Sequence, residues 1–253
     1  MLRTVTATRY VTPLREGGSL PGLVEADDDG LYVVKFSAAG QGLKALVAEV
    51  IVGELARSAG LPVPEVVFVE ISPELGRTEP DPEINELVTG SAGLNVGIDF
   101  LPGALDYNPA RPGELGPLLA SEIVWFDAFT TNVDRSPRNP NLLVWHRRTW
   151  LIDHGAALYL QHGERDLADR AEEPFPLIAD HVLLPLASEL QAADARLSAA
   201  LTPEVIAGVV DLVPSAWLGE TGERARVSYR DYLVRRVAAP RGFLTEAETA
   251  RGA

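Results

Sequence analysis

Residues 132–155 read NVDRSPRNPNLLVWHRRTWLIDHG, and this stretch carries the strongest structural signal in the chain. Two short apolar runs, residues 142–145 and 149–153, flank a charged turn at residues 146–148. Short runs rich in apolar and aromatic residues on either side of a polar turn predict two β-strands that pair. A hairpin of this kind folds Asp153 back beside the loop that precedes the first strand.

Three oxygen-bearing side chains lie in this stretch in a fixed order: Asp134, Asn139 and Asp153. Phosphoryl transfer needs a carboxylate that orients or deprotonates the acceptor, and oxygen ligands that hold Mg²⁺ against the phosphates. Taken singly, each residue is an ordinary turn residue. The ordered combination, with the hairpin between Asn139 and Asp153, favours metal-assisted phosphoryl transfer.

Two neighbouring residues offer alternatives within the same pattern. Asn141 is a second choice as metal ligand after Asn139, because it lies two residues further along. Asp127 precedes the loop, and we interpret it as a structural brace in preference to a further acidic ligand. The four histidines have no i, i+4 pairing, so a histidine metal cage is not expected.

Lys35 interrupts the apolar run at residues 31–36, where an ammonium group loses hydration if it is buried. A lysine on an edge strand with its ammonium in water is the common alternative. However, Lys35 and Lys44 are the only lysines among 22 basic residues, so all the other basic side chains are arginines. A compact point charge suits phosphate binding, and Glu49 on the following predicted helix is a natural ion-pair partner.

The chain on either side of these residues predicts an α+β fold with two lobes. Strands are expected within residues 5–36, 66–71 and 96–101, and residues 43–55 have helical periodicity. Residues 73–92 read as a loop or weak strand, and residues 160–175 as mobile or solvated. Helices are expected at 118–129, 180–201, 202–212 and 222–238. We therefore divide the chain into a β-rich lobe, 1–101, and a mainly helical lobe, 102–253.

Composition excludes several classes of function. The formal charge of −14 and the absence of a basic stripe disfavour nucleic-acid binding. The chain has no cysteine, which removes disulfides, thiolate zinc sites and cysteine nucleophiles. No stretch approaches the ~20 apolar residues of a membrane span, and the first residues lack the apolar core of a signal peptide. We expect a cytoplasmic protein.

Several of these motifs together resemble the HipA-like kinase family. They are the run at residues 30–36, the helix that carries Glu49 with residues 55–64 after it, the Asp134–Asn139 loop, and Asp153-His154-Gly155. The resemblance extends over most of the chain from about residue 17. The loop is also similar to that of type II phosphatidylinositol 4-kinases. His154 stands where kinases usually have the phenylalanine of Asp-Phe-Gly.

The resemblance implies a protein-kinase-like fold with a nucleotide-binding N-lobe, and it implies a role for each residue of the site. Lys35 would contact the ATP phosphates and Glu49 would pair with Lys35. Asp134 would be the catalytic base, while Asn139 and Asp153 would bind Mg²⁺. Backbone groups near Ile98 to Leu101 would face adenine.

The glycine-rich residues 17–22, with Ser19, offer backbone N–H groups that can cradle phosphates. Ser19 is also a candidate autophosphorylation site, although a small turn residue is the simpler interpretation.

We therefore expect an ATP- and Mg²⁺-dependent phosphotransferase, with a Ser or Thr hydroxyl of a protein as the acceptor that the resemblance implies. Two alternatives remain open. One is a small-molecule or lipid kinase on the same fold, although the charge of −14 argues against an anionic membrane surface. The other is a nucleotide-binding pseudokinase that acts as a scaffold.

Overall fold

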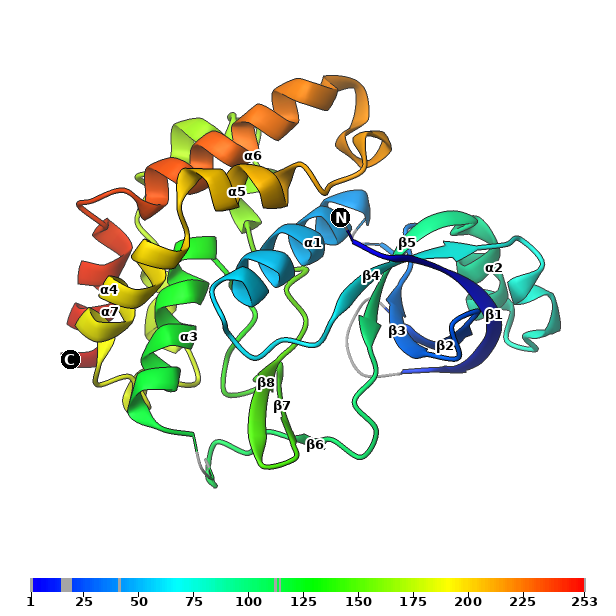
Figure 1. Ribbon diagram of the computed structural model, residues 1–253, viewed down its shortest axis with the longest axis horizontal. Coiled ribbons are helices and arrows are strands. Elements are labelled where there is room, and N and C mark those ends of the chain that lie inside the picture. Colours follow the sequence, from blue (N-terminus) through cyan, green and yellow to red (C-terminus); the bar gives the residue numbers. More distant parts are fainter. Residues whose placement is uncertain (1, 15–19, 41, 112, 114, 253) are drawn as a thin grey trace.

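The computed structural model describes residues 2–14, 20–40, 42–111, 113 and 115–252. A five-stranded β-barrel lies at one end of the molecule and a group of helices at the other, as Figure 1 shows. This is an α+β, protein-kinase-like architecture, as the sequence predicted. Within the described residues, no helix combines the length and the apolar character needed to cross a bilayer.

The barrel is closed and has the strand order β1-β2-β3-β5-β4. Neighbouring strands are antiparallel except β1 and β4, which run parallel and close the barrel. Valines from β2, β3 and β4 fill its interior. Gly97 lets β5 approach the interior valines, because a Cβ there would lie 2.5 Å from Val69 Cγ2. The strands are β1 (Thr4–Pro13), β2 (Gly22–Ala26), β3 (Leu31–Lys35), β4 (Val66–Ile71) and β5 (Gly93–Asp99).

Helix α2 (Pro82–Gly90) follows the short 3-10 helix η1 (Leu75–Thr78), and both lie where the sequence suggested a loop or weak strand. That expectation was wrong. The Asp81 side chain caps α2 by accepting from the Glu83 amide at 3.0 Å. Ile84 and Val88, four residues apart on the helix, are buried against the barrel cluster.

Helix α1 (Gly42–Ser58) links the two halves of the molecule. Every residue from Ala45 to Ala56 is buried, so the helix is covered on all sides. It packs against strands β4 and β5 and against helix α5 (Pro203–Val210), and Figure 1 shows it between the barrel and the C-terminal helices. The main hydrophobic core is therefore continuous across residue 101, and the division of the chain at that residue stays a prediction.

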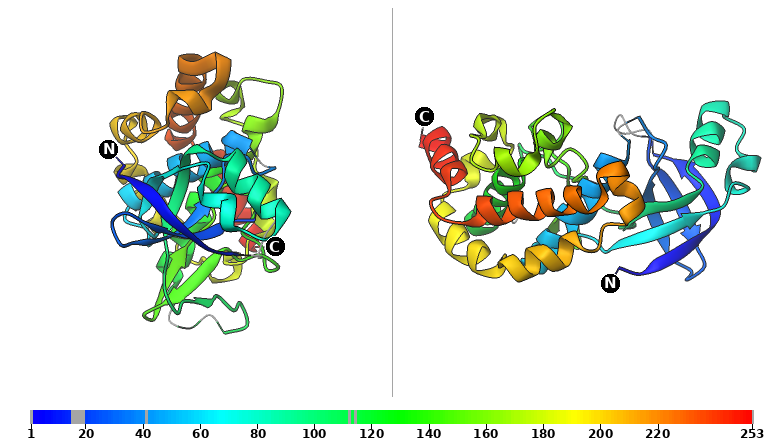
Figure 2. Two further views of the ribbon diagram at one scale, coloured as in Figure 1. Left: turned by 90° about the vertical axis from the view of Figure 1, so that its right-hand side faces the viewer. Right: turned by 90° about the horizontal axis from the view of Figure 1, so that it is seen from above.

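The second half of the chain is mainly helical, and Figure 2 shows its helices packed around the central helix α3 (Pro117–Thr130). The predicted hairpin is present as β7 (Leu142–Trp145) and β8 (Arg148–Leu151), with β6 (Leu105–Asp106) beside β7. The remaining α-helices are α4 (Leu190–Ala200), α6 (Gly222–Val237) and α7 (Gly242–Gly252).

Two sequence expectations need correction in this half. Residues 160–175 are not simply solvated, because Leu160, Leu167, Ala171 and Phe175 are buried. This stretch contains the short 3-10 helices η2 (Tyr159–His162) and η3 (Leu167–Arg170). The helix expected from residue 180 begins only at residue 190. It is preceded by η4 (Pro176–Asp180) and η5 (Leu184–Leu186), each with a proline in its first turn. A further 3-10 helix, η6 (Ser215–Thr221), precedes α6.

Candidate active site

Lys35, at the end of β3, contacts two carboxylates from different parts of the chain. Its Nζ atom donates to Glu49 Oε2 at 2.6 Å and to Asp153 Oδ1 at 2.5 Å. The Glu49 side chain is 1% exposed and the Lys35 side chain 10%, whereas the Asp153 side chain is 39% exposed. The structure therefore brings three of the predicted site residues into direct contact, with Asp153 on the open side.

The charges of these three groups depend on one another. Burial lowers the pKa of the Lys35 ammonium, but the Glu49 and Asp153 carboxylates outweigh this effect and raise that pKa above its ordinary value. Burial raises the pKa of Asp153, and the Lys35 ammonium outweighs it, so the pKa of Asp153 lies below its usual range. Lys35 is thus held as a cation and Asp153 as an anion.

The segment after β8 is shaped around this cluster. Asp153 has a left-handed backbone with φ 55°, a conformation that costs a non-glycine residue energy and recurs at functional sites. The backbone amide of Gly155 contributes to lowering the pKa of Asp153, and the backbone amide of His154 acts in the same direction on the pKa of Glu49. A Cβ at Gly155 would lie 3.3 Å from Lys35 Nζ, so glycine leaves room beside the ammonium.

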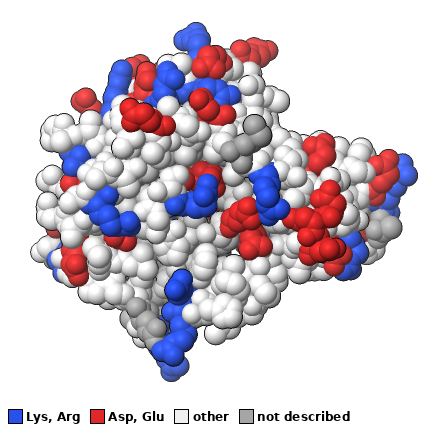
Figure 3. All heavy atoms as spheres, viewed as in Figure 1, with Lys and Arg blue, Asp and Glu red and all other residues white. Residues whose placement is uncertain are grey.

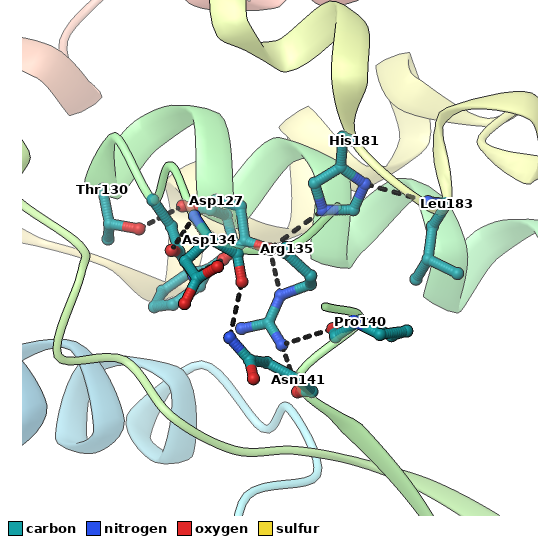
Figure 4. A network of polar contacts seen from close by, with 10 residues as sticks. Asp127, Thr130, Asp134, Arg135, Pro140, Asn141, His181 and Leu183 are labelled. Atoms are coloured by element: carbon teal, nitrogen blue, oxygen red, sulfur yellow. Dashed lines mark hydrogen bonds and ion pairs between the residues drawn. The ribbon is translucent and has the colours of Figure 1, made fainter. Parts of the chain in front are cut away.

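The loop that carries Asp134 is held by a buried network, shown in Figure 4. Asp127 Oδ2 accepts from Arg135 Nε at 2.5 Å and from His181 Nε2 at 2.9 Å, and Asp127 Oδ1 accepts from Asn132 Nδ2 at 3.0 Å. The Leu183 amide donates to His181 Nδ1 at 3.0 Å, which leaves the imidazole proton on Nε2. Asp127 is fully buried, so it braces the loop.

The pKa shifts of Asp127 and His181 agree with the role of Asp127 as a brace for the loop. Burial raises the pKa of Asp127, but the Arg135 guanidinium and the His181 bond outweigh burial, so the pKa lies below its ordinary value. Burial lowers the pKa of His181, and this effect exceeds the opposing effect of Asp127. The network is therefore a buried arginine–aspartate pair with a neutral histidine.

Asp134 and Asn139 meet within the loop. Asn139 Nδ2 lies 2.9 Å from both carboxylate oxygens of Asp134. Asp134 is half-buried and Asn139 is exposed, so this pair faces solvent. Asn141 lies deeper, where its Nδ2 atom donates to the Asp134 carbonyl at 2.5 Å.

Asn141 also connects the two groups of site residues. Its carbonyl accepts from the Ile152 amide at 3.1 Å, next to Asp153, and from Arg135 Nη1. Within the described part of the chain, the hydrogen bonds join Asp134 to the Lys35–Asp153 cluster through this backbone contact and not directly through side chains. Asn141 therefore hydrogen-bonds both to the loop that carries Asp134 and to the residue before Asp153 at the end of the hairpin.

The residues expected near adenine lie at the end of β5. Ile98 is buried and pairs with Val33 and Val66, and Leu101 is buried two residues beyond the strand. The Asp99 and Phe100 amides already donate to barrel carbonyls, at 2.9 and 3.0 Å. Ser19 lies outside the described residues.

Sequence reasoning missed the two residues Arg135 and His181 as partners of Asp127, and it missed the burial of His154. Arg135 and His181 hold Asp127, and His154 is 3% exposed with neither ring nitrogen hydrogen-bonded to a described residue. Burial lowers the pKa of His154 to about 3, so the ring is neutral. The one local signal was the arginine that directly follows Asp134, and nothing in the sequence shows that this arginine is buried.

A model of the HipA-like kinase family matches residues 8–236. The chain belongs to the HipA-like kinase family. This HipA-like kinase is a phosphotransferase enzyme, as the sequence predicted. No curated protein matches the chain.

Solved structures show the same fold at low sequence identity. The proinflammatory kinase CtkA of Helicobacter pylori is 13% identical with a TM-score of 0.56, over 90% of this chain and 94% of that one. The Golgi casein kinase is 14% identical with a TM-score of 0.53, over 99% of this chain and 74% of that one. A second Golgi casein kinase structure, with Mn/ADP bound, matches equally well over 75% of its chain.

The donor set of this HipA-like kinase fits a divalent cation shared with phosphate oxygens. Among the described residues, no three His, Cys, Asp or Glu side chains gather into an all-protein metal cage. Mg²⁺ at phosphate-transfer sites needs only one or two carboxylates, with water and substrate phosphates completing its coordination. Asp153 meets that need, because its side chain is partly exposed while its charge is fixed by Lys35.

Proposed function

We propose that this kinase transfers the terminal phosphoryl group of ATP to a hydroxyl group, with Mg²⁺ as the metal. The observation that carries the proposal is the position of Lys35, whose ammonium contacts Glu49 on one side and Asp153 on the other. In this arrangement a phosphate-binding cation lies beside a carboxylate that is available to a metal. The Mn/ADP complex of the Golgi casein kinase, which has the same fold, supports a nucleotide and a divalent metal here.

Each residue has a role that its position supports. Lys35 binds phosphate oxygens, and Glu49 holds the ammonium in place. Asp134 accepts a hydrogen bond from the acceptor hydroxyl and takes its proton as the oxygen attacks phosphorus. Asn139 and Asp153 would hold the metal, which would supply positive charge to the phosphates. Backbone groups between Ile98 and Leu101 face adenine.

We assign the acceptor as a Ser or Thr hydroxyl of a protein. The support is membership of the HipA-like family together with the fold shared with two proteins named as kinases, one of them a casein kinase. Asp134 and Asn139 face solvent, so a side chain on a separate protein can reach the carboxylate without entering a closed cavity.

The test is phosphoryl transfer from labelled ATP in the presence of Mg²⁺, measured as autophosphorylation and as ATP turnover. Asp134→Ala and Asp153→Asn are compared with the wild type and with Asp231→Asn, a control on α6 at an aspartate whose side chain is 43% exposed. We expect Asp134→Ala to lower kcat about 10²–10⁴-fold, and the control to leave it unchanged. Equal turnover in all four proteins would rule out this assignment of roles. Binding of Mg-ATP without turnover in the wild type would favour the scaffold alternative.

A further inference from the structure

Gln161 is a buried amide outside the catalytic residues, and all its side-chain polar atoms are hydrogen-bonded. It lies in η2, eight residues after Asp153, and is 7% exposed. A buried amide is costly unless its donors and acceptor are satisfied. Two partners of Gln161, Lys44 in α1 and Tyr229 in α6, are distant in sequence, so the residue joins separate parts of the chain.

Gln161 and Lys44 bind each other reciprocally. Lys44 Nζ donates to the main-chain carbonyl of Gln161 at 2.6 Å, and the side-chain Nε2 of Gln161 donates to the main-chain carbonyl of Lys44 at 3.3 Å. Lys44 is in the first turn of α1, five residues before Glu49. These two bonds attach the start of α1 to the segment that follows Asp153. They also account for the second of the two lysines, which the phosphate site does not use.

The other bonds of Gln161 anchor this attachment in the helical half. Tyr229 Oη on α6 donates to Gln161 Oε1 at 2.6 Å, and Gln161 Nε2 donates to the Ala157 carbonyl at 3.4 Å. Tyr229 and Ala157 are both buried. Ala157 is itself bound to the site segment, because its amide donates to the His154 carbonyl at 2.9 Å.

Helix α1 needs such an attachment to keep Glu49 in register with Lys35. The helix buries apolar side chains all round its circumference, and apolar contacts are non-directional. Hydrogen bonds at its first turn fix its rotation and its position along the axis. A small slide of α1 would move the Glu49 carboxylate away from Lys35 Nζ, where the present distance is 2.6 Å.

We propose that Gln161 is a positioning residue: bonded to Lys44 and Tyr229, it holds the first turn of α1 so that Glu49 remains on Lys35. The inference rests on the proposed function, since it assigns Lys35 to the phosphates. It means that the helix carrying Glu49 is fixed to the helical half of the molecule by a polar contact, and that Gln161 acts on phosphoryl transfer without touching the reactants.

The experiment uses Gln161→Met, which keeps the length of the side chain, removes its three side-chain hydrogen bonds and leaves the bond from Lys44 Nζ to the main-chain carbonyl, and Tyr229→Phe, which removes one bond. We expect Gln161→Met to lower kcat for ATP turnover about tenfold, a change in barrier of roughly 1.4 kcal/mol that the loss of these bonds can supply. Amides of residues 42–50 should exchange with solvent faster, and those of α3 should not. The control is Asn85→Leu, which removes the hydrogen bond from the Asn85 side chain in α2 to the Gly76 carbonyl in η1 and should change neither measurement.

A double-mutant cycle separates positioning from general destabilisation. If Gln161 acts through Glu49, Gln161→Met has no further effect on kcat when Glu49→Gln is already present. A full tenfold loss in that background overturns the proposal, and so does unchanged exchange at residues 42–50 in Gln161→Met. If Gln161→Met does not fold, Tyr229→Phe decides by the same two measurements. If the wild type turns over no ATP, the proposed function fails, and exchange at residues 42–50 still decides whether Gln161 holds α1.

Discussion

The Lys35 ammonium lies 2.5 Å from Asp153 Oδ1, and this contact joins two residues 118 positions apart in the chain. Lys35 belongs to the barrel, while Asp153 follows the hairpin of the helical half. The two halves of the molecule therefore meet at a charged contact between site residues. Glu49 supplies a second carboxylate from a helix that packs on both halves.

Removal of Lys35 should affect stability and activity by different routes. We expect Lys35→Met to abolish measurable phosphoryl transfer and to lower the free energy of unfolding by about 3–5 kcal/mol, because Glu49 is left buried without its cation. Lys35→Met combined with Glu49→Leu should recover most of the stability and none of the activity. Denaturant titration and labelled-ATP turnover measure the two effects. Activity in either variant would contradict the role given to Lys35.

Substitution of Asn139 should change the Mg²⁺ requirement, whereas substitution of Asn141 should change stability. Asn139→Ala removes an exposed side chain beside Asp134, so we expect unchanged unfolding and a Mg²⁺ requirement raised about tenfold or more, as for loss of a metal contact. Asn141→Ala removes the bond to the Asp134 carbonyl and should lower stability by about 1 kcal/mol. Turnover as a function of Mg²⁺ concentration distinguishes them. A raised Mg²⁺ requirement in Asn141→Ala alone would assign the metal to Asn141.

The sequence predicted those parts of the fold and site that depend on local pattern or on unusual residue usage. A β-rich apolar run indicated β3, helical spacing indicated α1, and the paired apolar runs indicated the β7–β8 hairpin. The scarcity of lysine singled out Lys35, and its predicted pairing with Glu49 is present at 2.6 Å. In each case the signal lies within a short stretch of chain.

What the sequence did not predict depends on contacts between distant segments. Nothing near Asp153 indicates that its carboxylate meets Lys35, since that contact requires the final packing of barrel and hairpin. His181 reaches Asp127 across 54 positions, and a lone histidine carries no signal of such a partner. Helix α2 was missed for a different reason: only Ile84 and Val88 are buried in it, which is too little periodicity to outweigh its polar residues.

As the pH is lowered, protonation of the buried histidines should reduce the free energy of unfolding at a higher pH than protonation of the carboxylates does. His154 has a pKa of about 3 in the folded protein and about 6.5 when unfolded. Its folded-state pKa is depressed, so the unfolded state binds more protons between these values, and stability is lost as pH falls through that window. Asp127 and Asp153, with lowered pKa values, act only nearer pH 4 and below.

The measurement is the free energy of unfolding at pH 7 and pH 5. His154 alone should lower it by about 2 kcal/mol between them, and His181 should add to the loss because its pKa is also lowered. His154→Phe should show the smaller pH dependence, whereas His146→Gln, at an exposed histidine, should behave as the wild type. Equal pH dependence in wild type and His154→Phe would show that the ring does not stay neutral when folded.

A side chain at position 155 should disturb the site without unfolding the protein. The Cβ of Gly155→Ala would lie 3.3 Å from Lys35 Nζ, 3.5 Å from Glu49 Oε2 and 3.6 Å from Asp153 Oδ1. Only the first distance is tight, so small movements relieve the contact and stability should change little. The ammonium is then displaced from its two carboxylates. Because small misplacements at a reacting centre cost rate steeply, we expect ATP turnover to fall about 10–100-fold.

The matched control is Gly208→Ala in α5, where a Cβ meets no atom within 4 Å. Alanine favours an α-helix over glycine by about 0.5–1 kcal/mol, so this variant should be as stable as the wild type or slightly more stable, with full activity. Turnover and thermal unfolding of both variants are compared in parallel. If Gly155→Ala retains full turnover, the space beside the Lys35 ammonium is not used by the phosphates, which would contradict the assignment of Lys35 as their ligand.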